Sequence, residues 1–147
     1  MTTDEVIEYF SYIGRIDSMI DRKIEEKEML YTLATKTTTG VSDGMPTGKG
    51  GSSDKVGNLT AKIVDMEEEI TGLIDDLADY KLEAAGFAQK LQKDQYDVVH
   101  MNMINRFKLG KVADRKGISY QWASELKKRA IQELSKIIDH SDLYEKI

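Results

Sequence analysis

A glycine-rich stretch at residues 44–58, GMPTGKGGSSDKVGN, contains the residue types of a loop that could hold a phosphate. Such loops follow the pattern G-x-x-x-x-G-K with Ser or Thr next, so that backbone amides surround the phosphate and the hydroxyl reaches magnesium. Here only three residues separate Gly44 from Gly48, and a glycine follows Lys49. No strand-like run precedes the stretch. The sequence therefore argues against a nucleotide site and indicates a flexible tether or a partner-binding loop.

Carboxylates are the other groups that could do chemistry, and they form two clusters at residues 67–69 and 75–79. Paired carboxylates can act as acid and base or hold a metal. Both clusters fall between the apolar positions of a helical repeat, which favours a solvated helix face. The chain has no cysteine, and His100 and His140 lack a second histidine at the helix spacing of a zinc site. We therefore expect no enzyme, no cofactor and no metal ion.

A segment near the C-terminus, VADRKGISYQWASELKKRA at residues 112–130, has the spacing of a helix-turn-helix. Ala113 is small enough to let two helices cross closely, and Gly117 permits a left-handed turn residue. Ser119 stands where the second helix needs an N-cap. The remaining apolar positions would be buried between the helices: Ile118, Ala123 and Leu126. A chance helical hairpin is the alternative to a true motif.

In such a motif, residues 120–134 form a recognition helix whose first turns approach the major groove of DNA. Gln121 could pair with adenine, and Ser124 with a base edge or a phosphate. Tyr120 or Trp122 could lie against a thymine methyl or the sugar backbone, although Trp122 could instead be partly buried against the preceding helix. The outward face consists of Ser119, Tyr120, Gln121, Trp122, Ser124, Glu125 and Lys128.

The charges of this region also favour DNA. Residues 90–138 carry eleven Lys or Arg and five acids, a balance of +6, which leaves −11 for the rest of a chain whose net charge is −5. Contacts to phosphates position a protein without reading sequence. The Glu125 carboxylate would either accept a hydrogen bond from the N4 amino group of cytosine or face a partner protein. Six basic side chains are candidates for phosphate contacts: Lys111, Arg115, Lys116, Lys127, Lys128 and Arg129.

Upstream, two long helices are predicted from apolar residues that recur at alternating steps of three and four. Residues 4–33 follow this rhythm, and residues 56–91 follow it throughout. The second seam consists of Val56, Leu59, Ile63, Met66, Ile70, Leu73, Leu77, Tyr80, Ala84, Phe87 and Leu91. Two seams of similar length predict an antiparallel helical hairpin, with pairing between chains as the alternative.

The hairpin would be joined by a flexible loop at residues 35–54, rich in Gly, Ser and Thr, with Ser53 or Asp54 as N-cap of the second helix. Val64 and Ile74 lie just off the seam. Because two helices alone would leave them uncovered, we expect a third helix or a second subunit over them.

A resemblance supports the same interpretation. The run DVVHMNMINRFKLGKVADRKGISYQWASELKKRAIQEL from Asp97 resembles the promoter-reading C-terminal helix-turn-helix of sigma factors, with the pattern VA-x3-GIS-x9-RA-x3-L. Three segments precede this run in the order SDGMP, residues 54–58 and ITGLIDDL. In this order of segments the chain is similar to phage late-gene transcriptional activators of the ArpU and RinA type. The resemblance implies a DNA-binding regulator of phage transcription that acts at a promoter and has RNA polymerase as a further partner.

We therefore expect an all-α chain with two domains: residues 1–92 form the helical hairpin, and residues 93–147 a sigma-like DNA-binding domain. Double-stranded DNA is the expected partner, either for a monomer or for a homodimer. No apolar run approaches the roughly 18 residues that span a membrane, so we expect the cytoplasm of a bacterial host. Two other functions fit the sequence: a phage packaging or assembly subunit that touches DNA, and a protein-binding module that targets host RNA polymerase.

Overall fold

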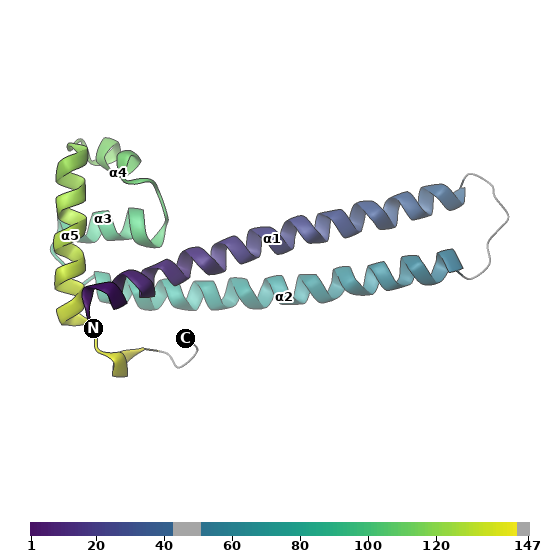
Figure 1. The fold of residues 1–147 in the computed structure, drawn as a ribbon, viewed down its shortest axis with the longest axis horizontal. Helices are drawn as coiled ribbons and strands as arrows, with labels where there is room; N and C mark the ends of the chain where they lie inside the picture. Colours follow the sequence, from purple (N-terminus) through teal and green to yellow (C-terminus); the bar gives the residue numbers. More distant parts are fainter. Residues whose placement is uncertain (43–50, 144–147) are drawn as a thin grey trace. The chain divides into compact units, whose positions relative to one another are not determined.

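A computed structural model describes the backbone of residues 1–42 and 51–143 and the side chains of residues 1–36 and 56–143. Within these residues every regular element is helical, which confirms the predicted all-α class. None of the described helices is long and apolar enough to cross a membrane. The elements in chain order are α1 (Thr3–Ser42), α2 (Gly51–Ala88), α3 (Lys93–Val98), the π-helix η1 (Val99–Ile104), α4 (Leu109–Lys116), α5 (Tyr120–Ile137) and the 3-10 turn η2 (His140–Asp142) (Figure 1).

The predicted loop at residues 35–54 is wrong over much of its length. Helix α1 continues to Ser42 and α2 begins at Gly51, so the two predicted caps, residues 53 and 54, lie inside α2. Threonines lower helix propensity only modestly, and extending a helix that already exists adds one hydrogen bond for each residue fixed. The hydroxyl of Thr35 donates to the Tyr31 carbonyl at 3.0 Å, so a threonine fits within α1. Residues 43–50 lie outside the described part of the chain.

Contacts divide the chain into two compact units, one of Ile16–Asp76 and one that combines Met1–Arg15 with Leu77–Ile147. Helices α1 and α2 each contribute to both units. The predicted boundary between residues 92 and 93 follows the end of α2, and residues on its two sides belong to the same unit.

In the unit Ile16–Asp76, the parts of α1 and α2 run side by side in opposite directions (Figure 1). The Lys23 ammonium lies 2.6 Å from the Glu69 carboxylate and joins the two helices. Every described position of the predicted seam is buried or partly buried, and Ile16, Ile20 and Ile70 are the most enclosed. Val64 and Ile74 remain 47% and 48% exposed, so no third helix among the described residues covers them.

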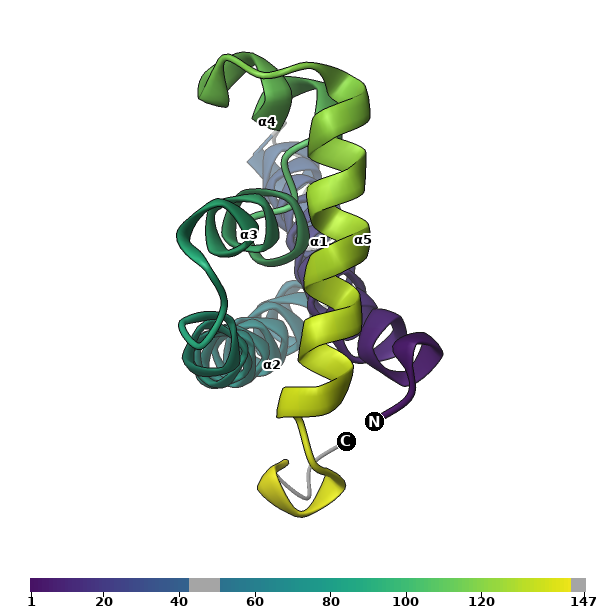
Figure 2. The ribbon, with the colours of Figure 1, turned by 90° about the vertical axis from the view of Figure 1, so that its left-hand side faces the viewer.

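In the other unit, the beginning of α1 and the end of α2 pack against η1 and α5. Figure 2 shows α5 passing in front of the start of α1, with the end of α2 to one side of α5. Their shared core consists of buried side chains, among them Val6, Tyr9, Phe10, Ile13, Tyr80, Ala84, Phe87, Val99, Ile104, Ala130, Leu134 and Ile138. Helix α5, which carries most of the predicted DNA-binding residues, is therefore packed onto the start of α1 and the end of α2.

The start of α1 is fixed by side-chain and backbone hydrogen bonds. The Thr2 hydroxyl accepts from the Glu5 amide at 3.1 Å, and the Glu5 carboxylate accepts from the Thr2 amide at 3.0 Å. This reciprocal arrangement satisfies two amides that a helix N-terminus leaves without partners. The Met1 ammonium donates to the carbonyls of Ser135 and Ile138 at 3.2 and 3.0 Å. A positive charge at these carbonyls complements the negative end of α5.

The π-helix η1 continues α3 and leads into the turn before α4. The Asn105 amide donates to the His100 carbonyl, five residues earlier, at 3.0 Å. Arg106 then adopts a positive φ of 62°. The Asn102 side chain donates to the Phe107 carbonyl at 2.8 Å and holds the chain just before α4. These contacts fix Phe107, whose ring organises the basic residues of α4.

Candidate nucleic-acid interface

The turn between α4 and α5 has the local geometry predicted from its residues. Gly117 adopts φ 65° and ψ 35°, a left-handed conformation that glycine enters without a Cβ penalty. The Ile118 amide donates to the Ala113 carbonyl at 3.0 Å and closes the end of α4. The Ser119 hydroxyl accepts from the Trp122 amide at 3.0 Å and caps α5. The predicted roles of Gly117 and Ser119 are confirmed.

Between the two helices lies a small apolar cluster. Val112 and Ala113 on α4 and Ala123 and Leu126 on α5 are 0–5% exposed. Val98, the last residue of α3, packs into the same cluster, and Ile118 is partly buried against it. The burial predicted for these positions is confirmed, and it directs the opposite face of α5 toward solvent.

That opposite face carries the side chains predicted to read DNA. Tyr120 is 59% exposed and Trp122 is 41% exposed. Gln121, Ser124 and Lys128 are exposed as well. The first turns of α5 thus present two aromatic rings, an amide, a hydroxyl and a cation on an accessible helix face.

Two cations of α4 are held by one aromatic ring. The Lys111 ammonium and the Arg115 guanidinium each lie 4.6 Å from the centroid of the Phe107 ring. Both side chains are exposed, and neither forms an ion pair with another described residue. Because a ring face attracts cations without neutralising them, their positive charge remains available to a ligand.

Lys116 is placed differently from the other predicted phosphate contacts. Its ammonium lies 2.7 Å from Asp97 and 3.5 Å from Asp94, and its side chain is only 13% exposed. The hydrogen bond to Asp97 raises the pKa of Lys116 above its ordinary value. Lys116 therefore joins α4 to α3. Nothing in the local spacing signals this contact, because the partners are 19 and 22 residues apart.

Glu125 also has a partner that its sequence position did not reveal. Its carboxylate accepts from the Arg129 guanidinium at 3.1 Å, one helical turn away. The same guanidinium lies 5.2 Å from the centroid of the Trp122 ring. Arg129 is therefore held between an acid and a ring on the exposed face of α5, whereas Lys127, two residues earlier, is partly buried.

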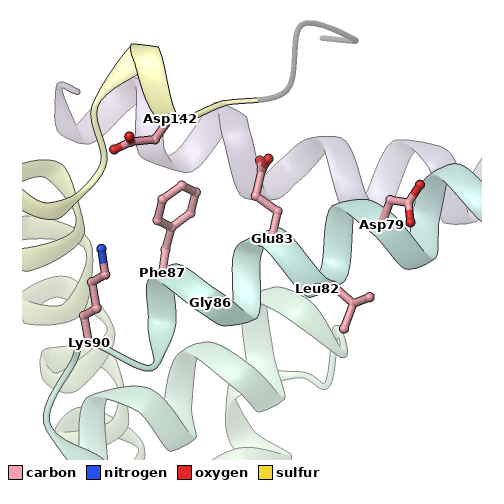
Figure 3. A pocket seen from close by; sticks show the side chains of 7 residues that line it. All are labelled: Asp79, Leu82, Glu83, Gly86, Phe87, Lys90 and Asp142. Carbon is pink, nitrogen blue, oxygen red and sulfur yellow. The ribbon is translucent and has the colours of Figure 1, made fainter.

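A hollow of about 440 Å³ opens beside the end of α2. Figure 3 shows the side chains of Glu83, Phe87 and Lys90 pointing toward the segment that carries Asp142. The hollow is shallow, and the Glu83 carboxylate already accepts from the Tyr9 hydroxyl at 2.6 Å. Among the described residues, no group of three potential metal ligands comes together. The hollow is lined by Asp79, Leu82, Glu83, Gly86, Phe87, Lys90 and Asp142.

Comparisons of the chain with protein-family models, with curated proteins and with solved structures give no match.

Proposed function

We propose that this chain is a transcriptional regulator that binds double-stranded DNA with α4 and α5 as a helix-turn-helix. One observation carries the proposal: α5 is capped by Ser119 and buries Ala123 and Leu126 on one side, while Tyr120 and Gln121 are exposed on the other. A recognition helix needs this division, because the same helix must pack on its domain and enter a groove.

The distribution of positive charge supports the proposal. Lys111 and Arg115 lie on α4 before the turn, without an acidic partner among the described residues, and Lys128 is exposed on α5. Such side chains suit phosphate contacts. Lys116 has no such role in the proposal, because its ammonium is bonded to Asp97 and Asp94.

The biological setting is proposed from the sequence motif. The pattern VA-x3-GIS-x9-RA-x3-L resembles the promoter-reading helix-turn-helix of sigma factors, and the order of segments resembles phage regulators of the ArpU and RinA type. On this basis the regulator acts at a phage promoter in the bacterial cytoplasm, with RNA polymerase as a further partner. In this proposal α1 and α2 serve as the helical hairpin that precedes the DNA-binding part.

Titration of labelled duplexes over a salt series tests the proposal. Affinity should fall steeply with salt, and the Lys111→Ala/Arg115→Ala variant should weaken binding to all duplexes and lower the logarithmic salt slope by roughly 2. The Lys36→Ala/Lys62→Ala variant is the matched control, because it removes two exposed cations from the unit Ile16–Asp76.

Failure of the wild type to bind any duplex at low salt would contradict DNA binding and favour the protein-binding alternative. An assembly of eight or more subunits, measured as particle mass, would instead favour a packaging ring. Selection of bound duplexes from a random pool would then identify the sequence that the regulator reads.

A further inference from the structure

A second stripe of side chains runs along α1 in the unit Ile16–Asp76, apart from the seam that faces α2. Its members recur at steps of three and four, so they share one face of the helix. Met19, Met29 and Leu33 are 46%, 66% and 50% exposed, and the two charged members are exposed as well. The stripe consists of Met19, Arg22, Glu26, Met29 and Leu33.

Large apolar side chains that line up on an exposed face mark an interaction surface more often than isolated ones do. Methionine suits such surfaces, because its unbranched thioether adapts to a partner. No described element of the chain covers Met19 or Met29.

The charges within the stripe indicate what the partner is. Arg22 and Glu26 stand at its centre, and neither forms an ion pair with another described side chain. Glu26 attracts Lys23 through space, but the Lys23 ammonium is bonded to Glu69. A partner for the stripe must therefore offer an acid opposite Arg22 and a base opposite Glu26.

The part of the stripe from Met19 to Met29 has this complementarity when a second copy lies antiparallel to it. With a twofold axis midway between Arg22 and Glu26, Arg22 faces Glu26 of the second copy. Met19 then faces Met29 of the second copy. Because the interface is isologous, each of these contacts occurs twice. A parallel, in-register pair would instead set Arg22 against Arg22 and Glu26 against Glu26, which is repulsive.

We propose that this stripe binds the same stripe of a second copy of the chain, antiparallel, with the axis between Arg22 and Glu26. The self-association is independent of DNA binding, since it uses the unit Ile16–Asp76 and none of the side chains of α4 or α5.

Disulfide trapping tests the direction and the register, because the chain contains no cysteine of its own. Equal amounts of Met19→Cys and Met29→Cys chains, mixed under oxidising conditions, should give a crosslinked dimer. Either variant alone should give little, because its two equivalent positions are ten residues apart along the pair, about 15 Å. A disulfide needs α-carbons within about 7 Å. Efficient crosslinking of Met19→Cys alone would overturn the antiparallel arrangement, and absence of crosslinking in the mixture would overturn the interface.

Charge exchange tests the central contact. Sedimentation equilibrium should give twice the 16.6 kDa mass of one chain. Arg22→Glu or Glu26→Arg alone should weaken dimerisation at least tenfold, because each places like charges face to face twice. The double variant should restore the dimer.

Glu28→Arg is the matched control, since it makes the same charge change as Glu26→Arg at an exposed position off both the stripe and the seam. Circular dichroism verifies that each variant is folded. A monomeric wild type, a double variant that stays monomeric, or an equal loss with Glu28→Arg would each overturn the proposal.

Discussion

The rings of Tyr9 on α1 and Tyr80 on α2 stack with centroids 5.0 Å apart, yet only one of the two hydroxyl groups has a partner. The Tyr9 hydroxyl donates to Glu83 at 2.6 Å. The Tyr80 hydroxyl is buried without a hydrogen-bond partner, the one such side-chain atom recorded in the described part of the chain. The pair therefore combines a satisfied and an unsatisfied phenol in one core.

Tyr80→Phe should raise the free energy of unfolding by about 1 kcal/mol, because a buried unpaired hydroxyl costs about 1–3 kcal/mol. Tyr9→Phe is the matched control and should lower the free energy by about 1 kcal/mol, since it breaks the bond to Glu83. Urea unfolding measures both. Destabilisation of similar size in the two variants would show that the Tyr80 hydroxyl is satisfied in solution.

Alkaline pH should destabilise the protein through the same two residues. Burial raises the pKa of Tyr9, and the Glu83 contact adds to this; burial likewise raises the pKa of Tyr80. The folded protein therefore keeps both protons above pH 10, where an unfolded tyrosine loses its proton. Their contribution is fully present below about pH 10 and decreases as pH rises above it.

Thermal midpoints between pH 9 and 11, followed by circular dichroism, measure this loss. The wild type should lose stability over this interval, and the Tyr9→Phe/Tyr80→Phe variant should lose less. Identical slopes for the two proteins would exclude these tyrosines as the cause.

Lys116→Met should lower the free energy of unfolding by about 1 kcal/mol, because it leaves the partly buried Asp97 without its cation. Lys128→Met removes an exposed cation from α5 and should change stability by less than about 0.5 kcal/mol. Chemical unfolding of both variants makes the comparison. A double-mutant cycle with Asp97→Asn should then give a coupling energy, and additive effects would argue against the contact.

Substitution by alanine should have opposite effects on stability at Gly117 and Gly72, although both glycines have open space where a Cβ would lie. Gly117 has a positive φ, so Gly117→Ala should cost about 1–2 kcal/mol of stability. Gly72 lies inside α2, where Gly72→Ala should add about 0.5–1 kcal/mol. Urea midpoints of the two variants test the signs, and a stabilising Gly117→Ala would contradict the left-handed turn.

Gln121→Ala should change which duplexes are bound best, with a loss of about 1–3 kcal/mol at one base pair. Lys127→Ala/Arg129→Ala should instead weaken binding to all duplexes similarly, because phosphate contacts carry no sequence information. Competition between selected and random duplexes separates the two effects. Unchanged preference in Gln121→Ala would remove this residue from the reading face.

Sequence patterns were sufficient where the cause of the structure is local. The left-handed turn at Gly117 and the cap at Ser119 depend on neighbours within a few residues, and the burial of Ala123 follows from helix periodicity. The long seams were predictable for the same reason, since a heptad repeat extends over many turns.

Contacts between distant residues could not be predicted in this way. Lys116 resembles any other basic residue of the motif, and only folding brings Asp97 beside it. The hydrogen bond from Tyr9 to Glu83 spans 74 positions. The extension of α1 to Ser42 has another cause: local propensity there is weak, but lengthening an existing helix adds a hydrogen bond for each residue fixed.

The packing of Val6 and Phe10 against Leu134 also affects how the chain is made. At about 5–20 residues per second, the ribosome needs on the order of 10 s to add the 128 residues from Ile7 to Leu134. Throughout that time the apolar start of α1 lacks part of its core and must avoid aggregation or premature pairing. Folding of this unit therefore waits for α5, and nascent chains that stop short of it should be the ones that chaperones retain.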